Sequence, residues 1–544
     1  MNNAVYQFEL PANEPVKGYA PGSPERIELQ AKLAELKSQE IEIPLIIGGK
    51  EVKTGNTAKV TMPTDHGHVL ATYHKAGPKE VQMAIDAALA AHKKWSEMPW
   101  VERASITLKA AELIATKYRA LMNASTMLGQ GKNAFQAEID AACETIDFLR
   151  FNANYAGQIY ADQPASSPGV INRLEYRPLE GFIFSLTPFN FTAIAANLNM
   201  APVLMGNVTV WKPATTAILS NYYLMKIFKE AGLPDGVINF IPGPGSVIGK
   251  EIFNHRDFAG IHFTGSTNTF QHFWNIIGGN IKKYRSYPRI VGETGGKDFV
   301  FAHSSAAVKQ LSVAITRGSF EYQGQKCSAA SRAYIPKSLW NDVKTFIGED
   351  LASIKMGDVT DFTNFHNAVI DEAAFDSITS YIQMAKDSNV AEIVYGGGSD
   401  KLKGYFIEPT VILTTDPHFI TMEEEIFGPV VTVYVYEDEK YAETLKLCDE
   451  TSPYALTGAI FAQDREKLLE AYEALRYSAG NFYLNDKPTG AVVGQQPFGG
   501  ARGSGTNDKA GSYLNLIRWT NTRTIKETLV APEDYRYPFL EEDK

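Results

Sequence analysis

The stretch Phe320-Glu321-Tyr322-Gln323-Gly324-Gln325-Lys326-Cys327-Ser328-Ala329-Ala330-Ser331 places a single cysteine, Cys327, in a turn rich in glycine and glutamine. A helix-like run over 311–322 precedes the turn, and a strand-like run over 332–336 follows it. A thiol at such a junction can stand at the mouth of a cleft, where its thiolate can attack an electrophile. A lone cysteine is more often core packing, so this thiol needs a chemical partner before it indicates catalysis.

A candidate partner is the carboxylate of Glu293, in the glycine-rich turn Val291-Gly292-Glu293-Thr294-Gly295-Gly296-Lys297. A thiol and a carboxylate on two such turns can form a pair of nucleophile and base. The two turns therefore indicate an enzyme in which Cys327 and Glu293 meet.

Length, charge and cysteine spacing limit the class of protein. A chain of 544 residues exceeds the size at which one core keeps growing, so we expect two or more domains. The net charge is -10 and no basic cluster is longer than residues 282–285, so neither nucleic acid nor an anionic membrane is an expected partner. The three cysteines are too far apart for a disulfide framework or a zinc site, so we expect no metal and a reducing compartment.

Targeting and membrane signals are absent from the sequence pattern. Residues 1–9 lack the basic and apolar regions of a secretory signal and the arginine and serine of a transit peptide. The most apolar longer stretch, 193–211, contains several asparagines and a proline and is too polar to span a bilayer. We therefore expect a soluble enzyme of the cytosol, or of the mitochondrial matrix if the chain is a mature form without its transit peptide.

Helical and strand-like patterns alternate along the chain. An N-terminal arm contains one helix over 25–37, with Ser23 as its predicted N-cap. Apolar residues at helical spacing predict amphipathic helices that include 81–89, 103–118 and 134–154. Largely apolar runs predict buried, parallel strands in two successive units, at 181–186, 208–212, 237–241 and 260–263, and then at 299–302, 332–335, 393–395, 410–413, 430–436, 457–461 and 481–484. The predicted fold class is α/β, with two doubly wound α/β domains.

The same patterns predict the domain boundaries. We expect an N-terminal arm over 1–42, a dinucleotide-binding domain made of 43–158 and 178–294, a catalytic domain over 295–514, and a small β ribbon with a tail made of 159–177 and 515–544. Residues 172–177 alternate like an edge strand, and the strand-like run 517–528 is their predicted mate. A projecting ribbon exposes unpaired backbone, so we expect a homodimer or a larger homo-oligomer.

Three features indicate a site for phosphate and ribose. Residues 261–267 predict a strand, a tight turn and a helix start, which would direct backbone N–H groups at an anion. An ordinary capped helix explains these residues equally well. Lys212 ends a buried strand, from which it could reach ribose hydroxyls or phosphate. The glycines of 242–249 do not have the spacing of the usual dinucleotide fingerprint, so they are only weak evidence for a dinucleotide site.

With these residues in view, nearly the whole chain resembles the aldehyde dehydrogenase family. Seven motifs occur in the order typical of that family, at 187–191, 211–213, 263–266, 292–297, 324–327, 424–429 and 497–500. Within the family, five stretches most closely resemble the branch of Δ1-pyrroline-5-carboxylate dehydrogenases, namely 13–16, 22–26, 293–298, 324–329 and 494–502. That branch oxidises glutamate γ-semialdehyde to glutamate in proline catabolism.

The resemblance implies a catalytic role for three residues. Cys327 would attack the aldehyde carbon to give a thiohemiacetal, whose hydride passes to a nicotinamide and leaves a thioester. Glu293 would then activate the water that releases the acid. The side-chain amide of Asn190 and the backbone N–H of Cys327 would hold the oxyanion.

The resemblance also implies NAD as the cofactor. Glu425 would hold the nicotinamide ribose, with Phe427 beside it. The remaining ribose and phosphate contacts would come from Thr187, Lys212, Gly265, Ser266 and Thr267. Many NAD-specific relatives carry a glutamate three residues after the lysine, whereas this chain has Thr215, so the use of NADP is less firmly excluded.

The implied substrate is a small aldehyde that ends in an amino acid. Ser328 and the backbone N–H groups of Gly490 and Ala491 would bind its carboxylate. Phe191 and Phe498 would contact its aliphatic part, and Glu144 would lie near its amino group. The branch often has serine where Ala491 stands, but a backbone donor survives that change. By its pattern alone, Glu144 is an ordinary solvated carboxylate on a helix.

Other functions stay open. Succinic or aminoadipic semialdehyde could be the substrate. A relative that passes the thioester to coenzyme A would not need a water-activating base such as Glu293. A catalytically silent structural homologue would not need to retain Cys327, Glu293, Asn190 and Glu425 together.

Overall fold

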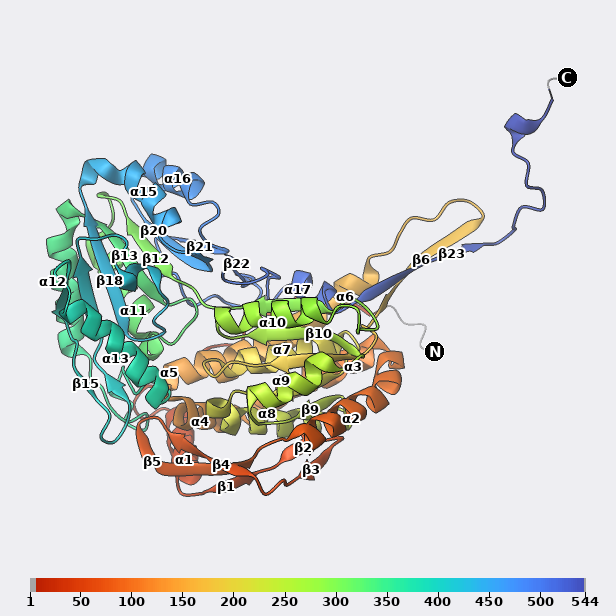
Figure 1. Ribbon diagram of the computed structural model, residues 1–544, viewed down its shortest axis with the longest axis horizontal. Coiled ribbons are helices and arrows are strands. Elements are labelled where there is room, and N and C mark those ends of the chain that lie inside the picture. Colours follow the sequence, from red (N-terminus) through yellow and green to blue (C-terminus); the bar gives the residue numbers. More distant parts are fainter. Residues whose placement is uncertain (1–5, 543–544) are drawn as a thin grey trace.

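Two seven-stranded sheets organise the computed structural model, which describes residues 6–542 (Figure 1). The predicted arm and tail reach the chain ends, so their residues 1–5 and 543–544 lie outside the described residues. Both sheets are mainly parallel and are covered by helices. The predicted α/β class with two doubly wound units is therefore confirmed. No helix within residues 6–542 has the length and apolar character needed to cross a membrane.

The first sheet is parallel through its five leading strands and antiparallel at its far edge. Its strands, in spatial order, are β11 (Arg289–Glu293), β10 (Phe258–Thr264), β7 (Phe182–Leu186), β8 (Thr209–Lys212), β9 (Ile238–Phe240), β2 (Leu45–Ile47) and β3 (Lys50–Val52). The last two strands pair antiparallel. The helices between the parallel strands are α7 (Thr192–Leu204), α8 (Ile218–Ala231), α9 (Gly245–Asn254) and α10 (Thr267–Gly279).

The second sheet repeats this arrangement in the C-terminal half. Its strands, in spatial order, are β14 (Ala391–Tyr395), β17 (Thr410–Thr414), β18 (Val430–Tyr436), β13 (Ala330–Pro336), β12 (Asp298–Ala302), β20 (Thr457–Phe461) and β21 (Asn481–Leu484). Its longer helices are α11 (Val308–Phe320), α12 (Lys337–Ser353), α13 (Glu372–Lys386), α15 (Tyr441–Glu450) and α16 (Arg465–Ala474). Contrary to the parallel prediction, β14 pairs antiparallel with β17. Their connection contains a small hairpin, β15 (Ser399–Asp400) with β16 (Phe406–Ile407), and no crossover helix.

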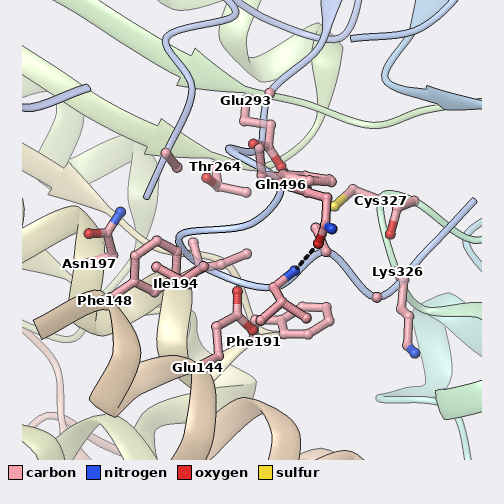
Figure 2. A pocket seen from close by; sticks show the side chains of 18 of the residues that line it. Glu144, Phe148, Phe191, Ile194, Asn197, Thr264, Glu293, Lys326, Cys327 and Gln496 are labelled. Carbon is pink, nitrogen blue, oxygen red and sulfur yellow. Dashed lines mark hydrogen bonds between the residues drawn. The ribbon is translucent and has the colours of Figure 1, made fainter. Parts of the chain in front are cut away.

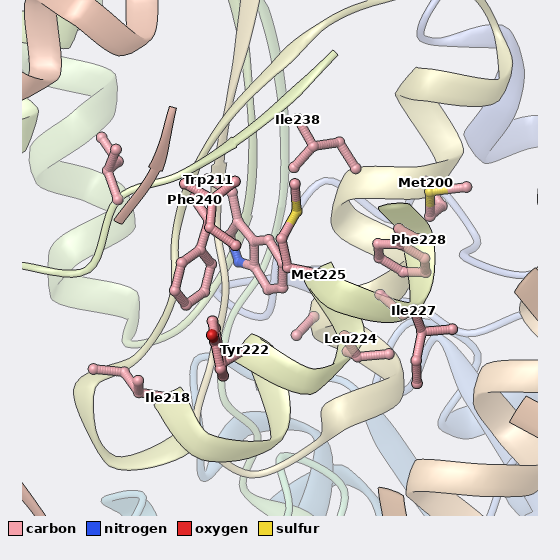
Figure 3. Close-up of a cluster of buried hydrophobic side chains, with 14 of the residues drawn as sticks. Met200, Trp211, Ile218, Tyr222, Leu224, Met225, Ile227, Phe228, Ile238 and Phe240 are labelled. Carbon is pink, nitrogen blue, oxygen red and sulfur yellow. The ribbon is translucent and has the colours of Figure 1, made fainter. Parts of the chain in front are cut away.

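A large apolar core fixes the first sheet against its helices (Figure 3). Trp211 on β8 is fully buried, and its ring packs edge-on against Phe240 on β9 at 5.1 Å between centroids. The indole N–H of Trp211 donates to Thr187 Oγ1 at 3.0 Å, at the carboxyl end of β7. This hydrogen bond therefore ties Thr187, at the edge of the sheet, to a residue of the buried core.

The N-terminal part wraps around the first sheet. It contains α1 (Pro24–Lys37), the three-stranded sheet of β1 (Ile41–Ile43), β5 (Asp65–His74) and β4 (Thr57–Met62), and helices α2 (Pro78–Glu97), α3 (Trp100–Thr116) and α4 (Arg119–Gln130). Ser23 caps α1 as predicted, accepting the N–H of Arg26 at 3.4 Å. The predicted helical run over 134–154 is confirmed, but it is divided into α5 (Ala134–Ala137), a π-helix (Glu138–Glu144) and α6 (Thr145–Ala161). Such π segments often occur at functional sites.

A two-stranded ribbon projects from the body (Figure 1). Strand β6 (Val170–Arg177) pairs antiparallel with β23 (Asn521–Thr528) over its whole length. The predicted pairing of these distant segments is therefore confirmed. Short elements complete the chain: α14 (Ile420–Glu423), α17 (Tyr513–Ile517), β19 (Tyr454–Ala455), β22 (Ala501–Arg502) and the 3₁₀ turns Thr215–Ala217, Glu321–Gly324, Asp438–Lys440 and Pro538–Leu540.

Candidate active site

Cys327 lies on the turn that joins α11 to β13. The 3₁₀ turn Glu321–Gly324 comes first, and within it Tyr322 and Gln323 have left-handed φ angles of 51° and 55°. Residues other than glycine keep such angles only where their surroundings hold them. Tyr322 donates its hydroxyl to the carbonyl of Gln130 at 3.0 Å, and the Gln323 amide donates to two further carbonyls at 2.9 and 2.8 Å. The turn that carries Cys327 is therefore rigidly held.

The thiol of Cys327 contacts the carboxylate of Glu293 (Figure 2). Glu293 ends β11 of the first sheet, and the distance from Sγ to Oε1 is 3.5 Å. Burial raises the pKa of the Cys327 thiol well above its usual range, and the charge of Glu293 raises it further. Burial also raises the pKa of Glu293 to about 7. A neutral thiol thus lies within reach of a carboxylate that is partly ionised near neutral pH.

Asn190 reaches the same turn from the loop between β7 and α7. Its side-chain amide donates to the carbonyl of Gln325 at 3.1 Å, two residues before Cys327. An amide group has two donor hydrogens, so one contact leaves the other free to bind an oxyanion.

A cavity of about 500 Å³ opens beside Cys327. It contains both members of the thiol–carboxylate pair and all the residues predicted for the substrate: Glu144, Phe191, Glu293, Cys327, Ser328, Gly490, Ala491 and Phe498. These side chains come from both sheets and from the π-helix. The predicted substrate residues are therefore brought together in one space.

We call the group of Ser328, Thr489, Gly490 and Ala491 the carboxylate corner of this cavity. The hydroxyls of Ser328 and Thr489 lie 2.8 Å apart, which joins the nucleophile's turn to the loop after β21. Gly490 has a φ of 95°, so a larger residue would be strained there. Backbone N–H groups of this loop are the donors predicted for an anionic group.

The N-terminal arm holds the loop that follows this corner. Asn13 donates to the carbonyl of Val493 at 2.7 Å and accepts from the amide of Gln495 at 2.8 Å. It also donates to Asp147 on α6 at 2.8 Å. Sequence reasoning noted the motif around Asn13 as a family resemblance, but nothing in its pattern predicted a contact with residues near 493.

Glu144 ends the π-helix and lines the cavity, together with Phe191 (Figure 2). Burial raises the pKa of Glu144 well above its usual range, and the charge of Asp140 adds to this, while Lys132 opposes it. The interpretation of Glu144 as an ordinary solvated carboxylate, which its sequence pattern alone favoured, is therefore wrong. Glu144 is a desolvated group that faces a ligand-sized space.

A buried ion pair, missed by sequence reasoning, supports this wall. Lys132 and Asp140 are fully buried, with Nζ and Oδ2 2.7 Å apart. Asp140 also accepts the N–H groups of Thr192 and Ala193 at 3.0 and 2.8 Å, which caps the start of α7. The Lys132 ammonium lies 4.0 Å from the ring centre of Phe191. The pair thus fixes Phe191 relative to the π-helix, and no local pattern around residue 132 indicated it.

The predicted nucleotide residues gather at the carboxyl ends of β10, β7 and β8, which are neighbours in the sheet. Lys212 ends β8, and its backbone carbonyl accepts the N–H of Thr187 at 3.3 Å. Ser266 caps α10 by accepting the N–H of Thr269 at 3.3 Å, next to Gly265 and Thr267. A helix N-terminus and a cation at one sheet edge suit a phosphate.

The charge state of Lys212 fits this use. Burial lowers its pKa to about 8, and within residues 6–542 it forms no ion pair. Its ammonium donates only to the carbonyl of Pro213 at 3.2 Å in that part of the chain. Thr215, where an acid would repel a 2′-phosphate, is exposed. The cation is thus free to meet an anionic group.

Glu425 and Phe427 approach from the second sheet. One carboxylate oxygen of Glu425 accepts the N–H of Gly296 at 3.0 Å, three residues after Glu293. Burial raises the pKa of Glu425 to about 7. The ring of Phe427 packs edge-on against Phe189 at 5.8 Å. A carboxylate with a second free oxygen beside the Glu293 turn fits a ribose diol, so the donor and acceptor set as a whole fits a dinucleotide.

The chain matches the model of the aldehyde dehydrogenase family over residues 51–525. The mitochondrial Delta-1-pyrroline-5-carboxylate dehydrogenase of Dictyostelium discoideum is 54% identical over 533 residues, which make up 97% of this chain and 96% of that protein. The Delta-1-pyrroline-5-carboxylate dehydrogenase of Agaricus bisporus is 54% identical over 536 residues, 98% of each. The crystal structure of the Delta-pyrroline-5-carboxylate dehydrogenase from Mycobacterium tuberculosis bound with NAD has a TM-score of 0.96 at 50% identity and covers 99% of this chain and 100% of that chain. The chain belongs to the aldehyde dehydrogenase family.

Proposed function

We propose that this protein is an NAD-dependent dehydrogenase that oxidises L-glutamate γ-semialdehyde, the open form of Δ1-pyrroline-5-carboxylate, to L-glutamate. The contact between the Cys327 thiol and the Glu293 carboxylate carries the proposal, because it lies in a cavity that Ser328, Gly490 and Ala491 also line. Relatives with this name at 54% identity over nearly the whole chain support the same activity.

Catalysis begins with proton transfer from Cys327 to Glu293. The thiolate then attacks the aldehyde carbon, and the new oxyanion accepts hydrogen bonds from the Asn190 amide and the Cys327 backbone N–H. NAD, when bound, supplies the hydride acceptor that converts the thiohemiacetal into a thioester. Glu293, after losing its proton to solvent, removes a proton from water, and the resulting hydroxide attacks the thioester carbon. The C–S bond breaks, glutamate leaves, and the sulfur recovers a proton.

Substrate recognition follows from the shape of the cavity. The carboxylate corner binds the α-carboxylate through Ser328 and the N–H groups of Gly490 and Ala491. Phe191 and Phe498 contact the aliphatic part, and Glu144 faces the amino end.

Residues of both sheets bind the cofactor. Lys212, Thr187 and the start of α10 at Gly265, Ser266 and Thr267 hold the adenosine ribose and the phosphates. Glu425, which already accepts from Gly296, would accept from the hydroxyls of the nicotinamide ribose, and Phe427 would lie beside that ribose.

The test is the specificity constant kcat/KM for glutamate, succinic and aminoadipic semialdehydes, each with NAD and with NADP. The proposal expects the highest value for glutamate γ-semialdehyde with NAD. A preference for succinic semialdehyde would contradict the substrate, and equal rates with both cofactors would contradict the cofactor choice.

The domain division and the assembly belong to the same proposal. Residues 43–158 with 178–294 form the NAD-binding domain and 295–514 the catalytic domain, in a soluble protein of the cytosol or the mitochondrial matrix. The ribbon of β6 and β23 pairs with a second copy of the chain, which gives a homodimer or a larger homo-oligomer. Light scattering on the full chain tests the assembly, and a monomer at micromolar concentration would contradict it.

A further inference from the structure

Three cations and one carboxylate surround the outer side of the carboxylate corner: Arg317, Lys326, Lys487 and Glu321. Lys326 and Glu321 form a nearly buried ion pair, with Nζ 3.2 Å from Oε2. Neither Arg317 nor Lys487 forms an ion pair within the described part of the chain. Among these four side chains, cations therefore outnumber the carboxylate by three to one, although the whole chain has a net charge of -10.

The ammonium of Lys487 lies directly against the carboxylate corner. It donates to the carbonyl of Thr489 at 2.9 Å. A Cβ atom added to Gly490 would lie 2.7 Å from the Lys487 nitrogen, so the ammonium occupies the space beside that glycine. The Thr489 hydroxyl in turn contacts Ser328. An ammonium has three donor hydrogens, so the bond to Thr489 leaves two for a ligand.

Lys487 also separates two cavities. It lines the active-site cavity and a second cavity of about 310 Å³, here called the outer cavity, which lies over α11 and the end of β21. Arg317 is shared in the same way, whereas Lys309 lines only the outer cavity. Lys487 is thus near enough to the carboxylate corner to contact a bound anion. Lys309 is a cation of the outer cavity that does not line the active-site cavity, so it can serve as a control.

We propose that Lys487 is a specificity-determining residue that selects aldehydes carrying a carboxylate over neutral aldehydes of similar length. Its ammonium holds the Thr489 carbonyl and so orients the N–H groups of Gly490 and Ala491, and its charge stabilises the bound carboxylate. The inference rests on the proposed oxidation of a carboxylate-bearing aldehyde. A charge-assisted hydrogen bond of this kind changes affinity by about 10- to 100-fold.

The experiment compares Lys487→Met, Lys487→Gln and the control Lys309→Met. Each full-length protein is assayed with NAD and with three aldehydes: glutamate γ-semialdehyde, succinic semialdehyde and butanal. Butanal has the four carbons of succinic semialdehyde but no carboxylate. The measured quantity is the ratio of kcat/KM for each carboxylate-bearing aldehyde to kcat/KM for butanal. Thermal unfolding of each variant checks that it is folded.

We expect Lys487→Met to lower this ratio by about 10- to 100-fold, chiefly through KM. Lys487→Gln can still donate to the Thr489 carbonyl but has no charge, and it should lower the ratio in the same direction. Lys309→Met should leave the ratio unchanged. An equal loss with butanal and with the semialdehydes would overturn the inference, as would a Lys487→Gln protein that keeps the wild-type ratio.

Failure of this inference is distinguishable from failure of the proposed function. If the wild-type protein oxidises none of the semialdehydes, the proposed function is wrong whatever the variants do. If the wild-type protein oxidises them and the ratio does not respond to Lys487, only the role of Lys487 is wrong. Competitive inhibition by the product L-glutamate gives a second readout, and Lys487→Met should weaken it without changing the affinity for NAD.

Discussion

Two regions of this molecule bury charge, and they do so in opposite ways. On the π-helix, Asp140 pairs with Lys132, and Glu138 contacts Arg119, Tyr19 and two further donors, so each of these two carboxylates is partnered. In the turn that carries Glu293, one buried charge has no such partner among the described residues. Lys297 Nζ has no hydrogen-bond partner within residues 6–542, and burial lowers its pKa to about 7. The partnered charges stabilise the framework, whereas Lys297, close to Glu293 in the same turn, keeps a buried ammonium without a hydrogen-bond partner in this part of the chain.

The largest expected effect separates catalysis from packing. Replacing Cys327 by alanine should abolish NADH formation, with a loss on the order of 10⁶-fold in kcat, because the covalent step is removed. Cys448→Ala is the matched control, since Cys448 is equally buried but lies in an apolar cluster of the second sheet. A Cys327→Ala protein that still reduces NAD with the semialdehyde would contradict the mechanism.

The partnered region predicts a loss of stability. Lys132→Met leaves Asp140 buried without its counter-charge, so the free energy of unfolding should fall by about 3–5 kcal/mol, measured by urea unfolding. The double variant Lys132→Met with Asp140→Leu should recover part of this loss, because no charge then remains buried. If Lys132→Met unfolds with the free energy of the wild type, the buried ion pair does not stabilise the fold, and the difference proposed between the two regions is wrong.

The oxyanion donor should affect the rate and leave stability nearly unchanged. Asn190→Ala is expected to lower kcat by about 10²- to 10³-fold, since one donor to the oxyanion is lost. Its unfolding midpoint should stay close to that of the wild type, in contrast to Lys132→Met. If kcat stays within a few-fold of wild type, Asn190 is no oxyanion donor.

The smallest expected effect is a pH dependence. Glu293 must be ionised to accept a proton, and its pKa is raised to about 7, so activity is lost as the pH falls through that value. Below pH 7, kcat/KM should fall by about tenfold per pH unit, and above it the profile should level off. Glu293→Gln should lower the rate and flatten this limb. A wild-type profile that is already flat between pH 5.5 and 8 would exclude Glu293 as the base.

Sequence patterns predicted the frame of this site well. The strand that carries Lys212 and the turns that carry Glu293 and Cys327 were predicted from short local patterns. The strand β11, which ends at Glu293, was not predicted. Patterns failed where tertiary packing decides the structure. The π-helix and the Lys132–Asp140 pair are local in sequence but are buried by other elements, and the contact of Asn13 with Val493 joins residues 480 positions apart. Apolar spacing does not indicate any of the three.

The bond between Asn13 and Val493 has a consequence for biosynthesis. Asn13 is synthesised 480 residues before Val493, which it contacts in the folded protein. The nascent chain can fold its early sheet while the substrate end of the cavity is still unfinished. A product terminated before Val493 would therefore contain every strand of the first sheet and yet lack part of the lining of the active-site cavity.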